Sequence, residues 1–350
     1  IGLSKLSTYL KIKRKENPGG TVVVSSGDMF QGSADSNLTR GYMVNYAMNY
    51  MGFDSMAVGN HEFDWTDTWL KKNSELSYKG NTIPYISANI VKKGTTETPE
   101  FLSKSTIVER NGYKIGIVGS IGDQLESTIL ASCVENYEFI DEVTAVNAEA
   151  AKLKDVDKCD IVLLTAHDDL DMLSSKGLTN VDAVFGGHAH ENKTTNIDGN
   201  IPAVQTENYG KSIAHIQLKI DKATKEVVPS EHELDESPLD LEGLVEDNDI
   251  KTIVANYSSE IDIIKGIKLG SCDSELRNDG ALKGICTEGM YQGALAGIKE
   301  LGLEISESEI LATFHNVNGG IRSNIKKGEI TYGDVYNPFP FDNEIVLYKL

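Results

Sequence analysis

The sequence Gly-Asn-His-Glu-Phe-Asp at residues 59–64 decides how the rest of the chain is interpreted. It follows the apolar run Ser-Met-Ala-Val at 55–58, which predicts a buried strand that opens into a polar turn. In open α/β sheets, ligands bind where strands release their carboxyl ends. The amide, imidazole and carboxylates of this turn therefore lie where chemistry is expected. Taken alone, the stretch is equally compatible with a hydrated turn and a helix N-cap, so the other strands must decide.

Three further predicted strands end in similar side chains. The apolar runs 21–24, 160–165 and 182–185 each have the composition of a buried strand. The groups that follow the four strands are Asp28, Asn60 with His61, His167, and His188 with His190. A single histidine after an apolar run is most often an ordinary core residue. Four of the seven histidines of the chain occur at these strand ends, and this coincidence favours one shared site.

The remaining pattern predicts an α/β protein of two domains. Helix-like spacing covers residues 1–17, 41–51 and 141–154, and Asn111-Gly112 between two apolar runs predicts a hairpin. From 231 to 249 the sequence becomes acidic and contains proline, which is typical of a linker, and a helical pattern follows up to residue 265. We therefore expect one domain at 1–230, a linker with a helix at 231–266, and a second domain at 267–350.

Composition limits the kinds of partner. The chain has 350 residues, of which 40% are hydrophobic and 25% charged, as in ordinary soluble globular proteins. Its formal net charge of −20 argues against unaided binding to nucleic acid or to an anionic membrane. No apolar run is long enough to cross a membrane, and no signal peptide is visible. The oligomeric state stays open, and Cys272 and Cys286 could pair in an oxidising compartment.

The ligand types at the strand ends indicate a metal site. Mixed oxygen and imidazole donors suit Zn, Mn, Fe, Co or Ni better than Ca. Asp28 offers a carboxylate that two ions could share, as two-metal sites require at a separation of about 3.5–4 Å. Any phosphate-bearing substrate of this acidic chain would need such local positive charge.

The order of these motifs resembles that of the calcineurin-like metallophosphoesterases. The strings at 27–33 and 59–64 are similar to those of the 5′-nucleotidase family, which includes the bacterial UDP-sugar hydrolase/5′-nucleotidase type and ecto-5′-nucleotidase. The string at 330–341 resembles the C-terminal domain of that family. The resemblance implies a four-layer αββα sandwich followed by part of a C-terminal α/β substrate-binding domain.

The resemblance also implies a role for each site residue. Two divalent metal ions, Zn, Mn or similar, are expected, with Asp28 bridging them. The resemblance assigns Asn60, His167 and His188 to the second metal and His190 to the first. His61 becomes the catalytic histidine that stabilises charge on the transferring phosphate, and Asp64 orients it. In the second domain the implied substrate-binding residues are Asn318, Gly320, Arg322 and Phe341, with Phe341 stacking on the nucleobase. The alternative for Phe341 is an ordinary core aromatic.

The sequence departs from the family pattern in three places. An Asp-x-His motif expected on an opening strand is absent, and the chain stops at Leu350 before the C-terminal domain should finish. Both departures resemble truncation, so the fragment alone is expected to be at most weakly active. The third departure is that Val317 stands where the family has asparagine, and this weakens the assignment of Asn318.

These features predict an enzyme that hydrolyses nucleoside 5′-monophosphates to nucleoside and phosphate with a metal-activated water. The alternatives on the same scaffold are a 2′,3′-cyclic nucleotide phosphodiesterase and a UDP-sugar diphosphatase. A non-catalytic surface-binding protein is the alternative from another class. The expected partner is a small nucleotide rather than a nucleic acid. The resemblance favours a secreted, periplasmic or cell-surface location.

Overall fold

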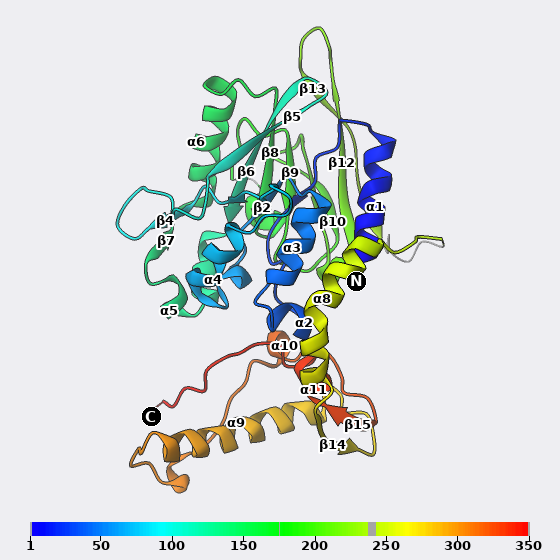
Figure 1. Ribbon diagram of the computed structural model, residues 1–350. Helices are drawn as coiled ribbons and strands as arrows, with labels where there is room; N and C mark the ends of the chain where they lie inside the picture. Colours follow the sequence, from blue (N-terminus) through cyan, green and yellow to red (C-terminus); the bar gives the residue numbers. More distant parts are fainter. Residues whose placement is uncertain (1, 175, 237–242, 349–350) are drawn as a thin grey trace. The chain divides into compact units, whose positions relative to one another are not determined.

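The computed structural model describes residues 2–174, 176–236 and 243–348, which form two compact units (Figure 1). The first unit comprises Ile1–Gln31 and Thr39–Asn256, and the second comprises Gly32–Leu38 and Tyr257–Leu350. The division between the units falls within helix α8 (Asn248–Lys265), which occupies the region where a linker helix was expected.

A six-stranded sheet with the order β10-β11-β9-β8-β6-β5 is the centre of the first unit. Its four inner strands are mutually parallel, and its two edge strands are antiparallel to their neighbours. The strands are β5 (Ser105–Arg110), β6 (Tyr113–Ile121), β8 (Ile161–His167), β9 (Ala183–Gly186), β10 (Lys193–Ile197) and β11 (Ile201–Gln205). The hairpin predicted at Asn111-Gly112 is confirmed: it joins β5 to β6, and both residues have positive φ (50° and 82°), as a type I′ turn requires.

Both faces of this sheet are apolar because alternate residues of its central strands enter two different cores. In β8, Ile161 and Leu163 face one core, whereas Val162 and Leu164 face the other. The second core is closed by helix α6 (Glu142–Asp155), whose Leu153 is fully buried in it. A strand buried on both faces needs such a continuous apolar run.

A second, three-stranded parallel sheet covers the other face of the large sheet. It contains β1 (Val24–Ser25), β2 (Ser55–Ala57) and β3 (Tyr85–Ile86) in that order. Ile86 of β3 lies in the same buried cluster as Ile117 of β6 and Ile161 of β8. The two sheets are therefore packed face to face.

Helix α3 (Tyr42–Met51) lies beside the small sheet (Figure 1). The side-chain Oδ1 of Asn49 accepts a hydrogen bond from the backbone N–H of Ile83 at 3.1 Å, just ahead of β3. Helix α1 (Leu3–Glu16) contacts α3. The layers are therefore helix, small sheet, large sheet and helix, which is the αββα arrangement that the family resemblance implies.

Further elements complete the first unit. They are η1 (Asn60–Phe63), α4 (Thr66–Ser74), β4 (Ile90–Lys92), η2 (Asp123–Thr128), α5 (Ala131–Val134), β7 (Tyr137–Phe139), α7 (Leu170–Leu173), η3 (Asn208–Gly210), β12 (Ser212–Ile220) and β13 (Val227–Glu236). Strand β13 pairs with β12 in an antiparallel hairpin and extends to Glu236, so residues 231–236 form a strand where an irregular linker was expected. Pairing with β12 satisfies its backbone despite the acidic sequence.

The second unit contains a small core and two short β-strands. Strand β14 (Lys268–Cys272) pairs antiparallel with β15 (Gly328–Thr331). The helices are α2 (Ala34–Asn37), α9 (Ala281–Glu300), η5 (Glu307–Glu309), α10 (Val317–Gly320) and α11 (Tyr332–Tyr336). Leu282, Ile321 and Ile325 are its buried centre.

The four cysteines are free thiols, including Cys272 and Cys286. Among the described residues, no helix has both the length and the apolar character needed to cross a membrane.

Candidate metal centre

The predicted metal ligands of four separate strands converge at one end of the two sheets. Asp28 follows β1 and Asn60 follows β2, so the small sheet supplies two of them. His167 is the last residue of β8 and His188 follows β9, so the large sheet supplies the others. Parallel neighbouring strands end at the same edge, which explains why residues so distant in sequence meet here.

Three of these residues form a compact ligand group. One ligand atom each from Asp28, His167 and His188 lies within 4.8 Å of the other two. Nε2 of His167 is 3.1 Å from Oδ2 of Asp28 and 3.1 Å from Oδ1 of Asn60. The rings of His167 and His188 have their centroids 5.3 Å apart. The structure thus brings together the four residues predicted to surround one ion.

The geometry fits a transition-metal ion. Two ligand atoms at about 2.1 Å from a tetrahedral metal are separated by about 3.4 Å, close to the distances around His167 Nε2. The other ring nitrogen, Nδ1, lies 2.7 Å from the carbonyl oxygen of Ser26. Because a carbonyl can only accept, Nδ1 carries the proton, and Nε2 is left as the atom that can bind a metal. Carboxylate, amide and imidazole donors together suit Zn, Mn or Fe.

The backbone at two of the ligands has a left-handed conformation that residues other than glycine rarely adopt. Asp28 and His188 both have positive φ, at 55° and 63°. Gly59 is packed so closely that a Cβ at this position would overlap Oδ1 of Asp28 and the ring of His167. Strain of this kind persists only where surrounding contacts enforce it, and it is concentrated at functional sites.

The ionisable groups of the centre shift one another's pKa values. Burial by itself would raise the pKa of Asp28, but the adjacent His167 and His61 outweigh it and hold that pKa well below its usual range. Burial opposes the protonation of His167, yet Asp28 and Glu62 raise its pKa to about 9. Burial lowers the pKa of His188, and the neighbouring His167 lowers it further. A metal cation would therefore replace a proton on His167 rather than enter an uncharged pocket.

His61 is held beside this group by two separate contacts. Its backbone N–H donates to Oδ1 of Asp28 at 2.9 Å, and its ring Nδ1 lies 2.9 Å from Oδ2 of Asp64. The side chains of His61 and Asp64 are 24% and 26% exposed, so the imidazole borders both the protein and the solvent. Burial alone would lower the pKa of His61, but the hydrogen bond to Asp64 and the charge of Asp28 give it a net upward shift.

His190 is placed differently from the other predicted ligands. It is exposed, its Nδ1 lies 3.3 Å from Nδ2 of Asn208, and it is not part of the compact group formed by the described residues. The left-handed backbone at His188 turns the chain before His190. The structure therefore places His190 outside the compact group formed by Asp28, His167 and His188.

Sequence reasoning assigned no role to Glu62, which the structure places inside the centre. Its side chain is 2% exposed and accepts hydrogen bonds from the backbone of both ligand-bearing turns. Burial, followed by the charge of Asp28, raises the pKa of Glu62 to about 7. Glu62 follows Gly59 by three residues, the spacing at which a glutamate accepts the N–H of a helix N-cap, and this signal could have identified its contact with Gly59.

A buried pair of acids that includes the residue after His167 was also missed. Glu142 and Asp168 are each 1% exposed. Ser120 Oγ donates to Glu142 at 2.8 Å, and Gln124 Nε2 donates to Asp168 at 2.9 Å. Burial and the charge of Asp168 raise the pKa of Glu142 to about 8. Asp168 Oδ1 also accepts from the N–H of Asp169 at 2.9 Å in the turn after β8, and only the tertiary fold brings Glu142 and Asp168 together.

The predicted substrate residues of the second unit are partly assembled. The guanidinium of Arg322 lies 5.0 Å from the ring centroid of Phe341, within the range of a cation–π interaction. Gly320 is buried, and its N–H donates to the carbonyl of Asn316 at 3.0 Å. The side chain of Asn318 lies outside the described part of the structure.

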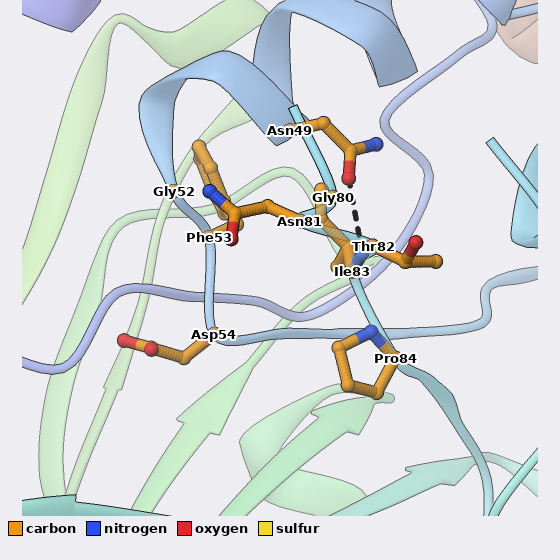
Figure 2. Close-up of a pocket in the computed structure, with 9 residues that line it drawn as sticks. All are labelled: Asn49, Gly52, Phe53, Asp54, Gly80, Asn81, Thr82, Ile83 and Pro84. Carbon is orange, nitrogen blue, oxygen red and sulfur yellow. Dashed lines mark hydrogen bonds between the residues drawn. The ribbon is translucent and has the colours of Figure 1, made fainter. Parts of the chain in front are cut away.

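The hollow in Figure 2 is separate from the metal ligands. It has a volume of about 430 Å³ and lies between the end of α3 and the segment that enters β3. Its lining residues are Asn49, Gly52, Phe53, Asp54, Gly80, Asn81, Thr82, Ile83 and Pro84. The amide oxygen of Asn49 points to the N–H of Ile83 and accepts its hydrogen bond. This polar group is used to hold the fold together.

Two facing sheets that deliver carboxylate, amide and imidazole donors at one end define a metal-dependent phosphoesterase. Comparison with known families supports this class. Residues 2–192 match the family described as calcineurin-like phosphoesterase, and residues 308–350 match the 5′-nucleotidase C-terminal domain. The chain belongs to the calcineurin-like phosphoesterases and, within them, to the 5′-nucleotidase family, as its motifs predicted.

Relatives of the chain are named for different activities. The chain is 30% identical over 368 residues to endonuclease YhcR of Bacillus subtilis, covering 98% of this chain and 28% of that protein. It is 28% identical over 387 residues to the 5′-nucleotidase of Bos taurus, covering 100% of this chain and 64% of that protein. The chain thus spans less than two thirds of the length of these relatives.

Solved structures show the same fold. The 5′-nucleotidase precursor from Thermus thermophilus superimposes with a TM-score of 0.73 at 21% identity, over 96% of this chain and 67% of that one. The sulfate thiohydrolase SoxB of the same organism superimposes with a TM-score of 0.72 at 17% identity, over 97% and 60%. At this identity the comparison establishes architecture and leaves the substrate open.

Proposed function

We propose that this protein hydrolyses nucleoside 5′-monophosphates to nucleoside and inorganic phosphate at a centre of two divalent metal ions. The observation that carries the proposal is the convergence of Asp28, His167 and His188, with their ligand atoms within 4.8 Å of one another. Asn60 completes the same set through its Oδ1, 3.1 Å from His167 Nε2. Membership of the 5′-nucleotidase family directs this chemistry toward nucleotides.

Each predicted site residue of the first unit has its own role in this proposal. Asp28, Asn60, His167 and His188 would hold one ion, and Asp28 and His190 would contribute to a second. Bound divalent cations neutralise phosphate oxygens and lower the pKa of a water molecule that can attack phosphorus. His61 donates a hydrogen bond to the charge that develops on the phosphate, and Asp64 fixes its ring orientation.

Electrostatics explains why such a centre is needed. The chain carries a net charge of −20, which repels a phosphate dianion at long range. A cation at the ends of β8 and β9 reverses the potential locally. Metal binding and substrate binding are therefore expected to be linked, so that the phosphate associates only with the loaded protein.

The second unit supplies the residues that would recognise the nucleoside. Arg322 and Phe341 are in contact through a cation–π interaction, with the guanidinium 5.0 Å from the ring centroid. A planar cation beside an aromatic ring suits a ligand that combines a base with a phosphate. Asn318 is proposed to contact the nucleotide through its side chain, and Gly320 through its backbone.

The second candidate is hydrolysis of a phosphodiester or diphosphate on the same scaffold, such as a 2′,3′-cyclic nucleotide or UDP-glucose. The relative named endonuclease YhcR favours this alternative, because an endonuclease cleaves diesters and its similarity extends over 98% of this chain. A non-catalytic surface protein is the third candidate.

One comparison of substrates separates these functions. Full-length protein loaded with Mn²⁺ or Zn²⁺ is assayed for phosphate release from AMP, and for cleavage of 2′,3′-cyclic AMP and UDP-glucose. We expect AMP to be the best substrate and His188→Ala to abolish its hydrolysis. Preference for a diester would support the second candidate. Absence of all three activities, with metal content unchanged by His188→Ala, would support a non-catalytic protein.

We also propose that the protein acts outside the cytoplasm, at the cell surface, in the periplasm or in the medium. The proposal rests on family membership. Fractionation of cells followed by immunodetection with an antibody against the chain tests it, and a purely cytoplasmic signal would contradict it.

A further inference from the structure

We propose that Glu62 is a positioning residue that fixes the two ligand-bearing turns for metal binding. In this role it touches neither metal nor substrate. This inference rests on the metal centre of the proposed function. It gives a task to a residue that the chemistry of phosphate transfer does not use.

The carboxylate of Glu62 is shared between two turns that are remote in sequence. Its Oε2 accepts hydrogen bonds from the N–H of Asp28 at 2.8 Å and of Gly59 at 2.7 Å. Its Oε1 accepts one from the N–H of Met29 at 2.8 Å. One buried side chain therefore binds the backbone on both sides of the centre, adjacent to the ligands Asp28 and Asn60.

The contact is reciprocal. Glu62 holds the backbone N–H of Asp28, and Oδ1 of Asp28 in turn accepts the N–H of His61 at 2.9 Å. The two turns are thus joined by hydrogen bonds in both directions. Asp28 still has Oδ2 directed at His167, 3.1 Å from Nε2. Oδ1 of Asp28 therefore binds the turn that contains His61, and Oδ2 is left for the group of metal ligands.

The strained backbone explains why such a residue is required. Gly27 and Asp28 have φ of 91° and 55°, and Gly59 lies against the carboxylate of Asp28. Residues other than glycine adopt this left-handed backbone conformation only when other contacts enforce it. The hydrogen bonds from the N–H groups of Asp28 and Met29 to Glu62 are two such contacts for the first turn.

Only a carboxylate satisfies all three donors. A glutamate anion accepts hydrogen bonds through both oxygens, whereas a glutamine has one accepting oxygen and an NH₂ group that can only donate. In Glu62→Gln the NH₂ would face at least one of the three backbone N–H groups. The side chain is 2% exposed, so water has little access to replace the lost bond.

The test measures metal affinity rather than turnover. Full-length wild type, Glu62→Gln and Glu62→Asp are titrated with Mn²⁺ or Zn²⁺ against a competing chelator. Glu149→Gln is the matched control. Glu149 is also buried, at 6% exposure, but it lies on α6 and accepts from Ser105 Oγ and Lys152 Nζ at 2.6 and 2.9 Å. Thermal unfolding of the metal-free proteins reports the general cost of losing a buried glutamate.

We expect Glu62→Gln to weaken metal binding about 10- to 100-fold, as loss of a residue that orients ligands generally does. Glu149→Gln should retain the wild-type metal affinity, and the metal-free melting temperatures of the two variants should be similar. Hydrogen exchange of peptides that contain residues 28, 29 and 59 should accelerate in Glu62→Gln alone.

Wild-type metal affinity in Glu62→Gln would overturn the proposal, as would an equal loss in Glu149→Gln. If Glu62→Gln does not fold, Glu62→Asp decides. Its shorter side chain cannot reach all three N–H groups, so undiminished affinity in this variant would also refute the role. The proposed function fails separately, by absence of nucleotide hydrolysis in wild type that binds metal.

Discussion

Replacing Asp64 with asparagine tests whether His61 acts as an oriented catalytic group. The substitution keeps the size of the side chain and removes the charge that faces Nδ1 of His61 at 2.9 Å. Asparagine can present its NH₂ group as well as its oxygen, so the orientation of the imidazole is no longer fixed. Because Asp64 does not belong to the ligand group, metal content should remain that of wild type.

The size of the effect follows from this hydrogen bond. A hydrogen bond to a charged group contributes about 1.5–3 kcal/mol, and each 1.36 kcal/mol corresponds to a tenfold change in rate. The expected fall in kcat for AMP is therefore about 10- to 150-fold. The lower part of this range is favoured because the side chains of His61 and Asp64 are 24% and 26% exposed.

The assay is steady-state phosphate release from AMP by full-length protein, together with metal analysis of the same samples. Asp67→Asn is the control, since Asp67 lies one turn further on and accepts instead from the hydroxyl of Tyr137 at 2.7 Å. A kcat within twofold of wild type in Asp64→Asn would refute the reasoning. A fall that is matched by Asp67→Asn, or that accompanies loss of metal, would refute it equally.

Three further predictions address other parts of the protein. His188→Ala should weaken Mn²⁺ or Zn²⁺ binding at least tenfold, because it removes a direct ligand. Competition with a chelator measures the affinity, and an unchanged value would contradict the prediction. Phe341→Ala should raise KM for AMP about fivefold or more without lowering kcat, since stacking on a base contributes about 1–3 kcal/mol; an unchanged KM would contradict this. Burial raises the pKa of Asp247, but the hydrogen bonds from Lys11 and Ser7 outweigh it and lower that pKa below 3.8. Asp247→Asn should therefore cost about 1–2 kcal/mol in urea unfolding at pH 7, and the difference should shrink as the pH falls below 3.8 and through the lowered pKa of Asp247. A difference that is independent of pH would show that the charge of Asp247 is not its cause.

The sequence allowed much of the metal site to be predicted because its signals are local. An apolar run followed by a polar residue that can bind a metal marks a strand end, and parallel strands end together. Asp28, Asn60, His167 and His188 follow this rule, and the structure places them in one group. The hairpin at Asn111-Gly112 was equally readable, because its turn type depends on two adjacent residues.

Other features depend on contacts that no local pattern reveals. The strands of the small sheet have only two or three residues each, and packing against the large sheet stabilises them. Residues 231–236 have an acidic sequence, yet pairing with β12 makes them part of a strand. The partners of Glu62 and of the pair Glu142 and Asp168 become visible only when turns separated by many residues are brought together.

The supply of ligands from both sheets has a consequence for stability. A metal bound to Asp28 and Asn60 of one sheet and to His167 and His188 of the other is a reversible cross-link across the sandwich. Its contribution to folding is not fixed but rises with free metal, by about 2.7 kcal/mol when the free concentration is 100 times the dissociation constant. The lifetime of the folded first unit is therefore expected to depend on the metal supply of its surroundings, and a chelator should act on it as a mild denaturant.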